Sequence, residues 1–152
     1  MIDINFLKGY TQRLQDSIDA IHFNKVIVDD SQMIRFLEDR SKHDNHLLFC
    51  VIPDFNPDGK NVDDLQFKAD TMFLVLNKTS YSEVNHDEFL NIMQETLLTA
   101  TAIKEKMIAD KFDYSAAGCM YMKQLNAQSI RITPIWAKAE CNGWSVEFNF
   151  DS

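Results

Sequence analysis

Apolar residues recur at helical spacing in two long segments of the chain. In residues 3–22 they fall three or four positions apart, at Phe6, Tyr10, Leu14, Ile18 and Ile21. In residues 86–111 a single stripe contains Phe89, Met93, Leu97, Ala100, Ile103 and Met107. Such spacing places the apolar side chains on one face, so it predicts two amphipathic helices. Asn85 followed by Glu88 is a capping-box-like start for the second, long helix.

The segments between these helices have shorter patterns. Residues 23–28 end in β-branched residues and predict a short strand. Asp29-Asp30-Ser31 then offers capping side chains for a short helix that ends near Arg40. Residues 47–52 form a continuous apolar run stopped by Pro53, which is typical of a buried strand.

Residues 53–64 contain Asn-Pro-Asp-Gly and predict a loop. The next strand is predicted over residues 66–77, and its segment 72–76 is apolar on both faces, so it must be covered on both sides. Residues 115–126 leave two alternatives open. Ser115 is a suitable cap for a short helix there, whereas Gly118 disfavours one.

The C-terminal segment, residues 130–150, predicts a β-hairpin. Asn142-Gly143 is the preferred pair for a two-residue type I′ turn, because both of its positions need a positive φ. A turn there sets large residues against small ones on one face, pairing Cys141 with Trp144, Ala139 with Val146, Ala137 with Phe148 and Ile135 with Phe150. On the other face it pairs Lys138 with Glu147, an opposite-charge pair.

In this register Trp136 lies on the polar face, beside Lys138 and opposite Asn149. An aromatic residue on a polar face is typical of a protein contact, unless another part of the same chain covers it. Pro134 cannot donate to a sheet ladder, so it predicts an edge strand or a bulge. Together these elements predict one α+β domain over residues 1–152. Its antiparallel or mixed sheet of four or five strands packs against two or three helices.

Composition narrows the class of partner. The chain has 15 Lys and Arg against 23 Asp and Glu, a net charge of −8. Nucleic acids and anionic membranes attract basic surfaces, so we expect neither as a direct partner. The start of the chain has no basic segment before an apolar core, and no apolar run approaches the roughly 18 residues of a membrane span, so we expect a cytoplasmic protein. Three cysteines, an odd number in apolar surroundings, predict reduced core thiols.

The sequence assigns no metal, cofactor or catalytic residue. Asp54, Asn56, Asp58 and Gly59 match the first positions of an EF-hand loop, but Leu65 stands where the bidentate Glu is required, so a plain turn is preferred. His43, His46 and Cys50 lack a fourth ligand nearby, and the histidines are interpreted as solvated loop residues. No cysteine–histidine, G-x-S-x-G or H-E-x-x-H arrangement indicates an enzyme.

The order of elements resembles that of phage and prophage tail-associated proteins, including tail-terminator and neck-connector subunits. The resemblance lies in the apolar segment and helix over 23–37, the strand 47–53, the strand 67–76, the long helix and the final segment Gly-Trp-Ser-Val-Glu-Phe at 143–148. It implies a structural protein that forms homo-oligomers, such as rings, and contacts other phage structural proteins. It also implies a place in the virion, and it carries over no functional residue.

An independent argument also favours self-association. One long, one medium and one short helix cover one sheet face fully and the other only in part, so a partner subunit is expected to cover the rest. The candidate interface residues are Trp136, Lys138, Asn149, Met72, Leu74 and Leu76. The alternatives are an intramolecular three-layer arrangement and, for function, a small cytoplasmic enzyme or ligand-binding protein with a cleft near residues 54–64.

Overall fold

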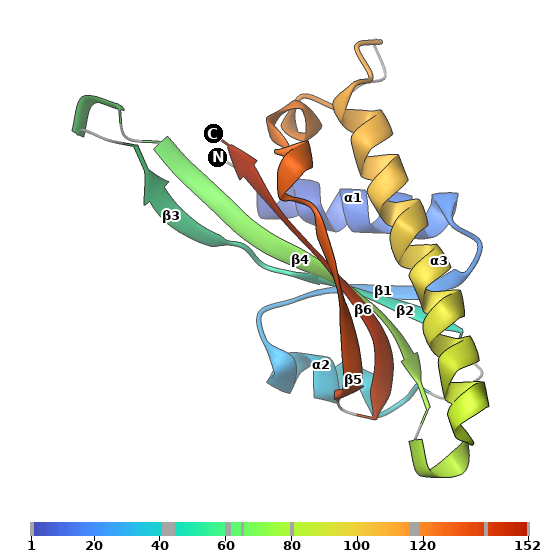
Figure 1. Ribbon diagram of the computed structural model, residues 1–152. Helices are drawn as coiled ribbons and strands as arrows, with labels where there is room; N and C mark the ends of the chain where they lie inside the picture. Colours follow the sequence, from blue (N-terminus) through green and yellow to red (C-terminus); the bar gives the residue numbers. More distant parts are fainter. Residues whose placement is uncertain are drawn as a thin grey trace.

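The computed structural model describes residues 2–40, 45–59, 62–64, 66–79, 81–115, 119–138 and 140–151. Within these residues the chain forms three α-helices and a mixed sheet of six strands, so the predicted α+β class is confirmed (Figure 1). In chain order the elements are α1 (Ile4–Ser17), β1 (Ile21–Ile27), α2 (Asp30–Leu37), β2 (His46–Val51), β3 (Asp54–Asp58), β4 (Gln66–Lys78), α3 (His86–Lys111), β5 (Arg131–Lys138) and β6 (Cys141–Asp151).

The helices begin where the sequence places a capping side chain. The Asp3 carboxylate accepts hydrogen bonds from the first backbone N–H groups of α1, and Asp29 does so for α2. Asn85 Oδ1 accepts from Glu88 N at 2.8 Å, and Asn85 Nδ2 donates to Glu88 Oε1 at 3.0 Å, so α3 has the bounds that the pattern predicts. Helix α1 ends at Ser17, earlier than predicted, because Ile21 and the residues after it pair with β2.

The strands lie in the order β1-β2-β4-β6-β5. β1 and β2 are parallel and are joined through α2, the crossover that parallel neighbours require. The remaining pairs are antiparallel. β4, with 13 residues, is the longest strand, and α3 follows it in the chain. β3 pairs with the first half of β4, and these two strands project from the body of the domain (Figure 1).

Two apolar clusters lie on the two faces of this sheet. The larger one contains α1, α3 and the sheet residues beneath them. The smaller one contains Met33 and Leu37 of α2 packed on the opposite face. Leu74 and Leu76 belong to this smaller cluster and are buried there. Helices of the same chain therefore cover both sides of β4 at these residues, and the argument that a partner must cover Leu74 and Leu76 was wrong.

The predicted hairpin register was also wrong. The structure pairs Lys138 with Cys141, Ile135 with Gly143 and Pro134 with Trp144, so the strands reverse next to Glu140. Glu140 has φ of 62°, the left-handed conformation that a tight turn needs. The partners of the expected Lys138–Glu147 pair are separated. Lys138 Nζ lies 3.0 Å from Asp30 Oδ1, and Glu147 faces Arg131 with a shortest N–O distance of 3.9 Å.

Tertiary pairing explains why Asn142-Gly143 is not the turn. Gly143 lies inside β6, and a Cβ added to it would be 1.9 Å from the backbone oxygen of Val75 in β4. The neighbouring Asn142 is buried, and its Nδ2 donates to Thr79 O at 3.0 Å. Both residues are therefore used for close packing of β6 on β4, and the turn forms next to them.

Two further expectations differ from the structure, and one segment left open by the sequence is described in part. The predicted loop 53–64 contains strand β3, which raises the strand number to six. His46 is buried at the start of β2, where its Nδ1 and Thr99 Oγ1 form a 2.7 Å hydrogen bond, so it is not a solvated loop residue. His43 lies outside the described residues. In the ambiguous segment 115–126, the described part contains a short 3-10 helix at Tyr121–Gln124.

Candidate interaction groove

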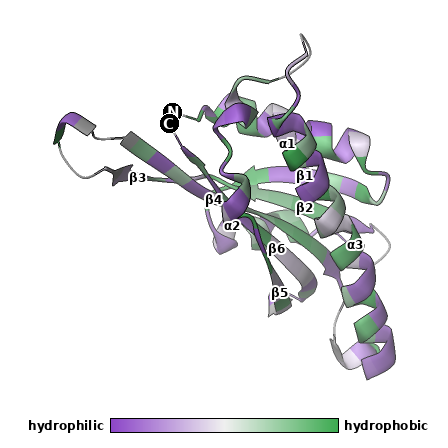
Figure 2. Cartoon of the chain, turned by 45° about the horizontal axis from the view of Figure 1, so that its top comes forward, coloured by the Kyte–Doolittle hydropathy of each residue, from purple (hydrophilic) through white to green (hydrophobic). Residues whose placement is uncertain are grey.

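An apolar groove runs between the first turns of α3 and the end of β5. Its volume is about 750 Å³, within the range of ligand and peptide pockets. The residues that line it are His86, Phe89, Leu90, Met93, Pro134, Ile135, Trp136 and Trp144. In Figure 2 the first turns of α3 lie beside the ends of β5 and β6, with apolar residues along the helix. We call this feature the Trp136 groove.

A hydrogen bond fixes the distance between the two walls. Trp144 of β6 donates from Nε1 to the backbone oxygen of Met93 at 2.9 Å. This bond ties the sheet to α3 and holds the Trp144 ring at the base of the groove, half-buried. Because a buried indole N–H needs an acceptor, the geometry of this wall is specified by one polar contact. The groove is therefore built by elements that are fixed to each other.

Regular alternation along β5 directs Trp136 into the groove, and a β-bulge separates it from Lys138. Ile135 pairs with Gly143 and Lys138 pairs with Cys141, so three steps along β5 match two steps along β6. An extra residue in one strand moves the following side chains to the opposite face. Trp136, two residues after Pro134, lies with Pro134 and Trp144 on the α3 side, whereas Lys138, after the bulge, lies on the α2 side and contacts Asp30. The expectation that Trp136 and Lys138 share the polar face was wrong.

Trp136 remains 67% exposed in this position. A large aromatic side chain at the centre of an apolar surface is the type of residue that contributes most to protein–protein contacts. The strand that carries it, β5, is at the end of the sheet order, and among the described strands only β6 pairs with it. An edge strand beside an apolar groove provides both backbone groups and apolar surface for a partner.

The first turns of α3 are acidic, but the lining of the groove contains no carboxylate. The first three turns of α3, residues 86–97, contain Asp87, Glu88 and Glu95 and no Lys or Arg. All three carboxylates are exposed. None of the three lines the groove, and Glu95 interacts with His46 of β2, on the side of α3 that faces away from β5.

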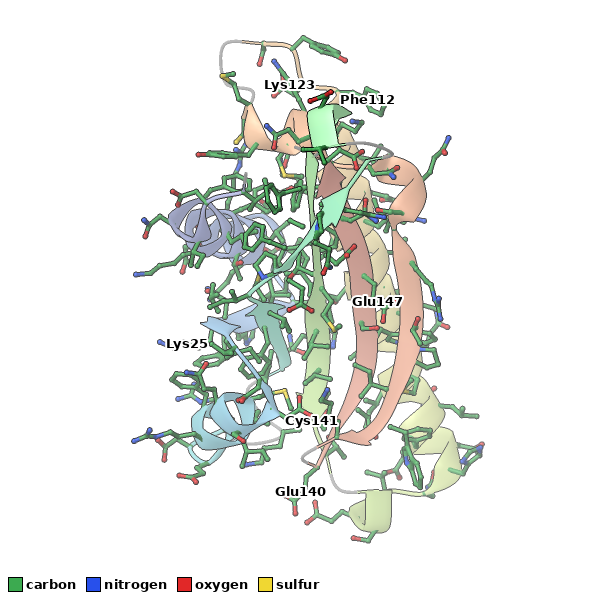
Figure 3. The ribbon with its side chains drawn as sticks, turned by 90° about the vertical axis from the view of Figure 1, so that its left-hand side faces the viewer. Lys25, Phe112, Lys123, Glu140, Cys141 and Glu147 are labelled. Carbon is green, nitrogen blue, oxygen red and sulfur yellow. The ribbon has the colours of Figure 1, made fainter. Side chains whose placement is uncertain are left out.

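A second, more polar recess lies on the α2 side of the sheet. It has a volume of about 440 Å³, and its wall includes Asp54, Asp70, Met72, Arg131 and Glu147. Figure 3 shows Glu147 on this face of the sheet, beside the strands. The candidate residue Asn149 also lines the recess, and its Oδ1 is buried without a hydrogen-bond partner among the described residues.

The six candidate interface residues therefore separate into three groups. Trp136 lies in the groove. Asn149 and the half-buried Met72 line the recess on the α2 side, and Lys138 lies on the same side beside Asp30. Leu74 and Leu76 are in the core.

Sequence reasoning missed the helical wall of the groove. Phe89 and Met93 belong to the apolar stripe that predicts the long helix, and they are only half-buried. The available signal was Leu90, an exposed leucine that lies outside this stripe and lines the groove with them.

The buried titratable groups have structural surroundings. Burial raises the pKa of the Cys50 and Cys141 thiols to about 12, which disfavours the reactive thiolate. Burial, with the carboxylate of Asp110 beside it, also raises the pKa of Tyr10, whose hydroxyl donates to Asp110 Oδ2 at 2.8 Å. Burial lowers the pKa of His46. Each of these groups lies within the core or ties α1 or β2 to a neighbour.

In the described part of the chain, no three His, Cys, Asp or Glu side chains lie close enough together to hold a metal ion. The described helices include none with the length and hydropathy needed to cross a membrane. Comparison of the chain with protein-family models, with curated proteins and with solved structures finds no match.

Proposed function

We propose that this protein is a structural or assembly subunit that acts by binding protein, including further copies of itself, through the Trp136 groove. The observation that carries the proposal is the 67% exposed Trp136 in an apolar groove of about 750 Å³ beside an edge strand. Exposed apolar surface of this kind costs free energy in water, about 25 cal/mol per Å², and burial against a partner recovers it.

The sequence pattern places the proposal in a class. The order of helices and strands supports a phage or prophage tail-terminator or head–tail connector subunit, with other phage structural proteins as additional partners. Proteins of that class act through surfaces and not through catalysis. The apolar lining of the groove favours a partner that presents apolar side chains.

The test is the state of association of the wild type and of Trp136→Ala, measured by sedimentation velocity over a wide concentration range. Loss of an aromatic residue at the centre of a contact costs about 2 kcal/mol or more, so we expect self-association to weaken by roughly thirtyfold. Leu98→Ala is the matched control. Leu98 is also on α3 and 63% exposed, but it lies outside the groove. If Trp136→Ala and Leu98→Ala sediment like the wild type at every concentration, the proposal is rejected.

A ligand-binding role is the second candidate, and Asn149 favours it. Its buried, unpartnered Oδ1 and the nearby carboxylates of Asp54, Asp70 and Glu147 would accept hydrogen bonds from an amine. Titration with a diamine, followed by amide chemical shifts, distinguishes the two roles. Shifts confined to the recess that saturate and disappear in Asn149→Ala would support the ligand-binding role, and no saturable shift would remove it.

A further inference from the structure

The lining of the Trp136 groove is aromatic and uncharged. Phe89 comes from α3, Trp136 from β5 and Trp144 from β6. The His86 ring stacks on Phe89, with 6.0 Å between the ring centres. None of the described residues in the lining is Asp, Glu, Lys or Arg. A partner is therefore recognised here by packing on ring faces, since a charged group would lose its water without meeting an opposite charge.

The aromatic faces are held in place before a partner arrives. The Trp144 N–H donates to the backbone oxygen of Met93, so Trp144 offers its ring to a partner and not its donor. The same bond fixes β6 to α3. Trp136 lines the same groove and is 67% exposed. Large, rigid aromatic side chains lose little conformational entropy when they bind, so the groove is suited to a ligand that is itself already ordered.

An added β-strand does not suit the open edge of β5. Strand addition needs a regular row of backbone donors and acceptors along that edge. Pro134 has no N–H, and a sheet accommodates a proline where its nitrogen points away from the neighbouring strand, here β6, so the missing donor lies on the open edge. The bulge between Ile135 and Lys138 breaks the row a second time. The edge keeps single backbone groups for a partner, but it does not keep a ladder.

The groove is also short. Its wall on α3 extends from His86 to Met93, which is about 10 Å at 1.5 Å per residue. Only about two turns of an α-helical ligand can lie along it, and helices of that length are marginal in water. One turn of a polyproline II helix is about 9 Å long, and this helix is ordered before binding without internal hydrogen bonds. The length of the groove therefore favours polyproline II.

We propose that the Trp136 groove binds a proline-rich segment of another protein in the polyproline II conformation. Proline rings pack on the aromatic faces, and such a segment needs neither a ladder nor an opposite charge. The 152 residues of this chain contain three prolines, Pro53, Pro57 and Pro134, with no P-x-x-P spacing, so the segment belongs to a different protein. This inference rests on the proposed function, in which the groove binds protein, and it specifies a partner.

The test uses the tryptophans as reporters. Both tryptophans of the chain line the groove, so the tryptophan fluorescence of the folded protein reports on this site alone. The probe is a peptide of proline residues only, and the comparison peptide has the same length and contains only Gly and Ser. The protein is held at a concentration at which sedimentation velocity shows a single species. We expect a saturable change with the proline peptide and none with the comparison peptide.

Two substitutions of Trp136 separate ring packing from general apolar contact. Trp136→Phe keeps an aromatic face, whereas Trp136→Leu keeps only apolar area, and Trp144 remains as the reporter in both. We expect Trp136→Leu to weaken binding of the proline peptide by about tenfold or more, and Trp136→Phe to weaken it less. Phe112→Leu is the matched control, because Phe112 is 55% exposed on the same chain but lies outside the groove. Equal weakening by Trp136→Phe and Trp136→Leu would overturn recognition by ring faces.

The opposite wall gives a second, independent variant. Leu90 is 49% exposed on α3, and Leu90→Glu places a carboxylate in the uncharged lining. Leu98→Glu makes the same change in charge on the same helix, outside the groove. Circular dichroism checks that both variants keep the wild-type fold. We expect Leu90→Glu to weaken binding several-fold and Leu98→Glu to leave it unchanged. If the proline peptide binds Leu90→Glu and Trp136→Leu as it binds the wild type, its site is elsewhere and the inference is overturned.

The outcomes separate this inference from the proposed function. If Trp136→Ala weakens self-association but the proline peptide gives no saturable change, the groove binds protein of another kind, and only this inference is overturned. Saturable binding of a Thr-Val strand peptide or an amphipathic helical peptide in place of the proline peptide would overturn it in the same way. If the proline peptide binds while the wild type and Trp136→Ala sediment alike, the inference stands and self-association through the groove is rejected. If neither effect is seen, both proposals fail.

Discussion

Gly143→Ala should destabilise the protein severely, although Asn-Gly looks like a turn in the sequence. The added Cβ would lie 1.9 Å from Val75 O, 3.0 Å from Val75 C and 3.1 Å from Leu76 Cα. All three atoms are backbone atoms of the central strand β4, so no side-chain rotation relieves the overlap. An ordinary contact needs at least 3.4 Å, and β4 or β6 must therefore move apart by more than an ångström.

The cost follows from what that displacement breaks. Overpacking a core costs about 1–3 kcal/mol, and each ladder hydrogen bond that lengthens beyond its usual range removes about 0.5–1.5 kcal/mol. With two such bonds affected, the free energy of unfolding should fall by about 2–6 kcal/mol. A domain of this kind has about 5–15 kcal/mol in total. Urea unfolding, followed by tryptophan fluorescence, measures the change.

Two substitutions serve as controls. Gly9→Ala makes the same chemical change in α1, where an added Cβ meets nothing within 4 Å, and should stabilise the protein by about 0.5–1 kcal/mol. Glu140→Gly relieves the positive φ at the turn and should be neutral or stabilising by up to about 1 kcal/mol. If Gly143→Ala costs less than about 1 kcal/mol, or if Glu140→Gly costs more than that, the hairpin register is wrong.

Three further predictions concern buried groups. Burial lowers the pKa of His46, so the unfolded chain takes up a proton before the folded protein does as the pH falls below about 6.5. The free energy of unfolding should therefore decrease in this pH range. In urea titrations at pH 5–7, His46→Asn should lack this part of the pH dependence. Tyr10→Phe should cost about 1.5–3 kcal/mol in thermal or urea unfolding, because the buried hydroxyl donates to the Asp110 carboxylate, and a cost no greater than that of an exposed Tyr→Phe change would contradict this role. At pH 8 a thiol reagent should modify the half-buried Cys119 in the folded protein, and it should modify all three cysteines only after unfolding. Rapid labelling of three thiols in the native state would disprove the burial of Cys50 and Cys141.

Local chemistry made the helices predictable. The caps of α2 and α3 are side chains that bond to backbone groups three residues away, so the sequence alone contains both partners. The apolar run 72–76 likewise showed that β4 is covered on both faces, because a strand without a polar face cannot be exposed on either side. The α+β class follows from these elements, because the spacing of apolar residues in each helix and strand can be read from the sequence alone.

The candidate site was predictable only in part. Trp136 and the edge-strand meaning of Pro134 were recognised from residue type. Its partners in the groove, Leu90 and Met93, are more than 40 positions away and belong to a helix whose apolar stripe is wider than its core contact. Which part of such a stripe remains uncovered depends on the angle at which α3 crosses the sheet.

Tertiary structure decided the register of the hairpin and the faces of its residues. In the sequence Asn-Gly is the preferred pair for the turn, whereas in the structure the strands reverse next to Glu140. Gly143 lies in β6 because its missing side chain allows close contact with Val75 O, and the buried Asn142 donates to Thr79 O. This close packing of β6 on β4 outweighs the local preference of Asn-Gly for a turn. The chain by itself thus determined its helices and apolar strands, whereas contacts between distant residues decided where β5 turns and where Trp136 points.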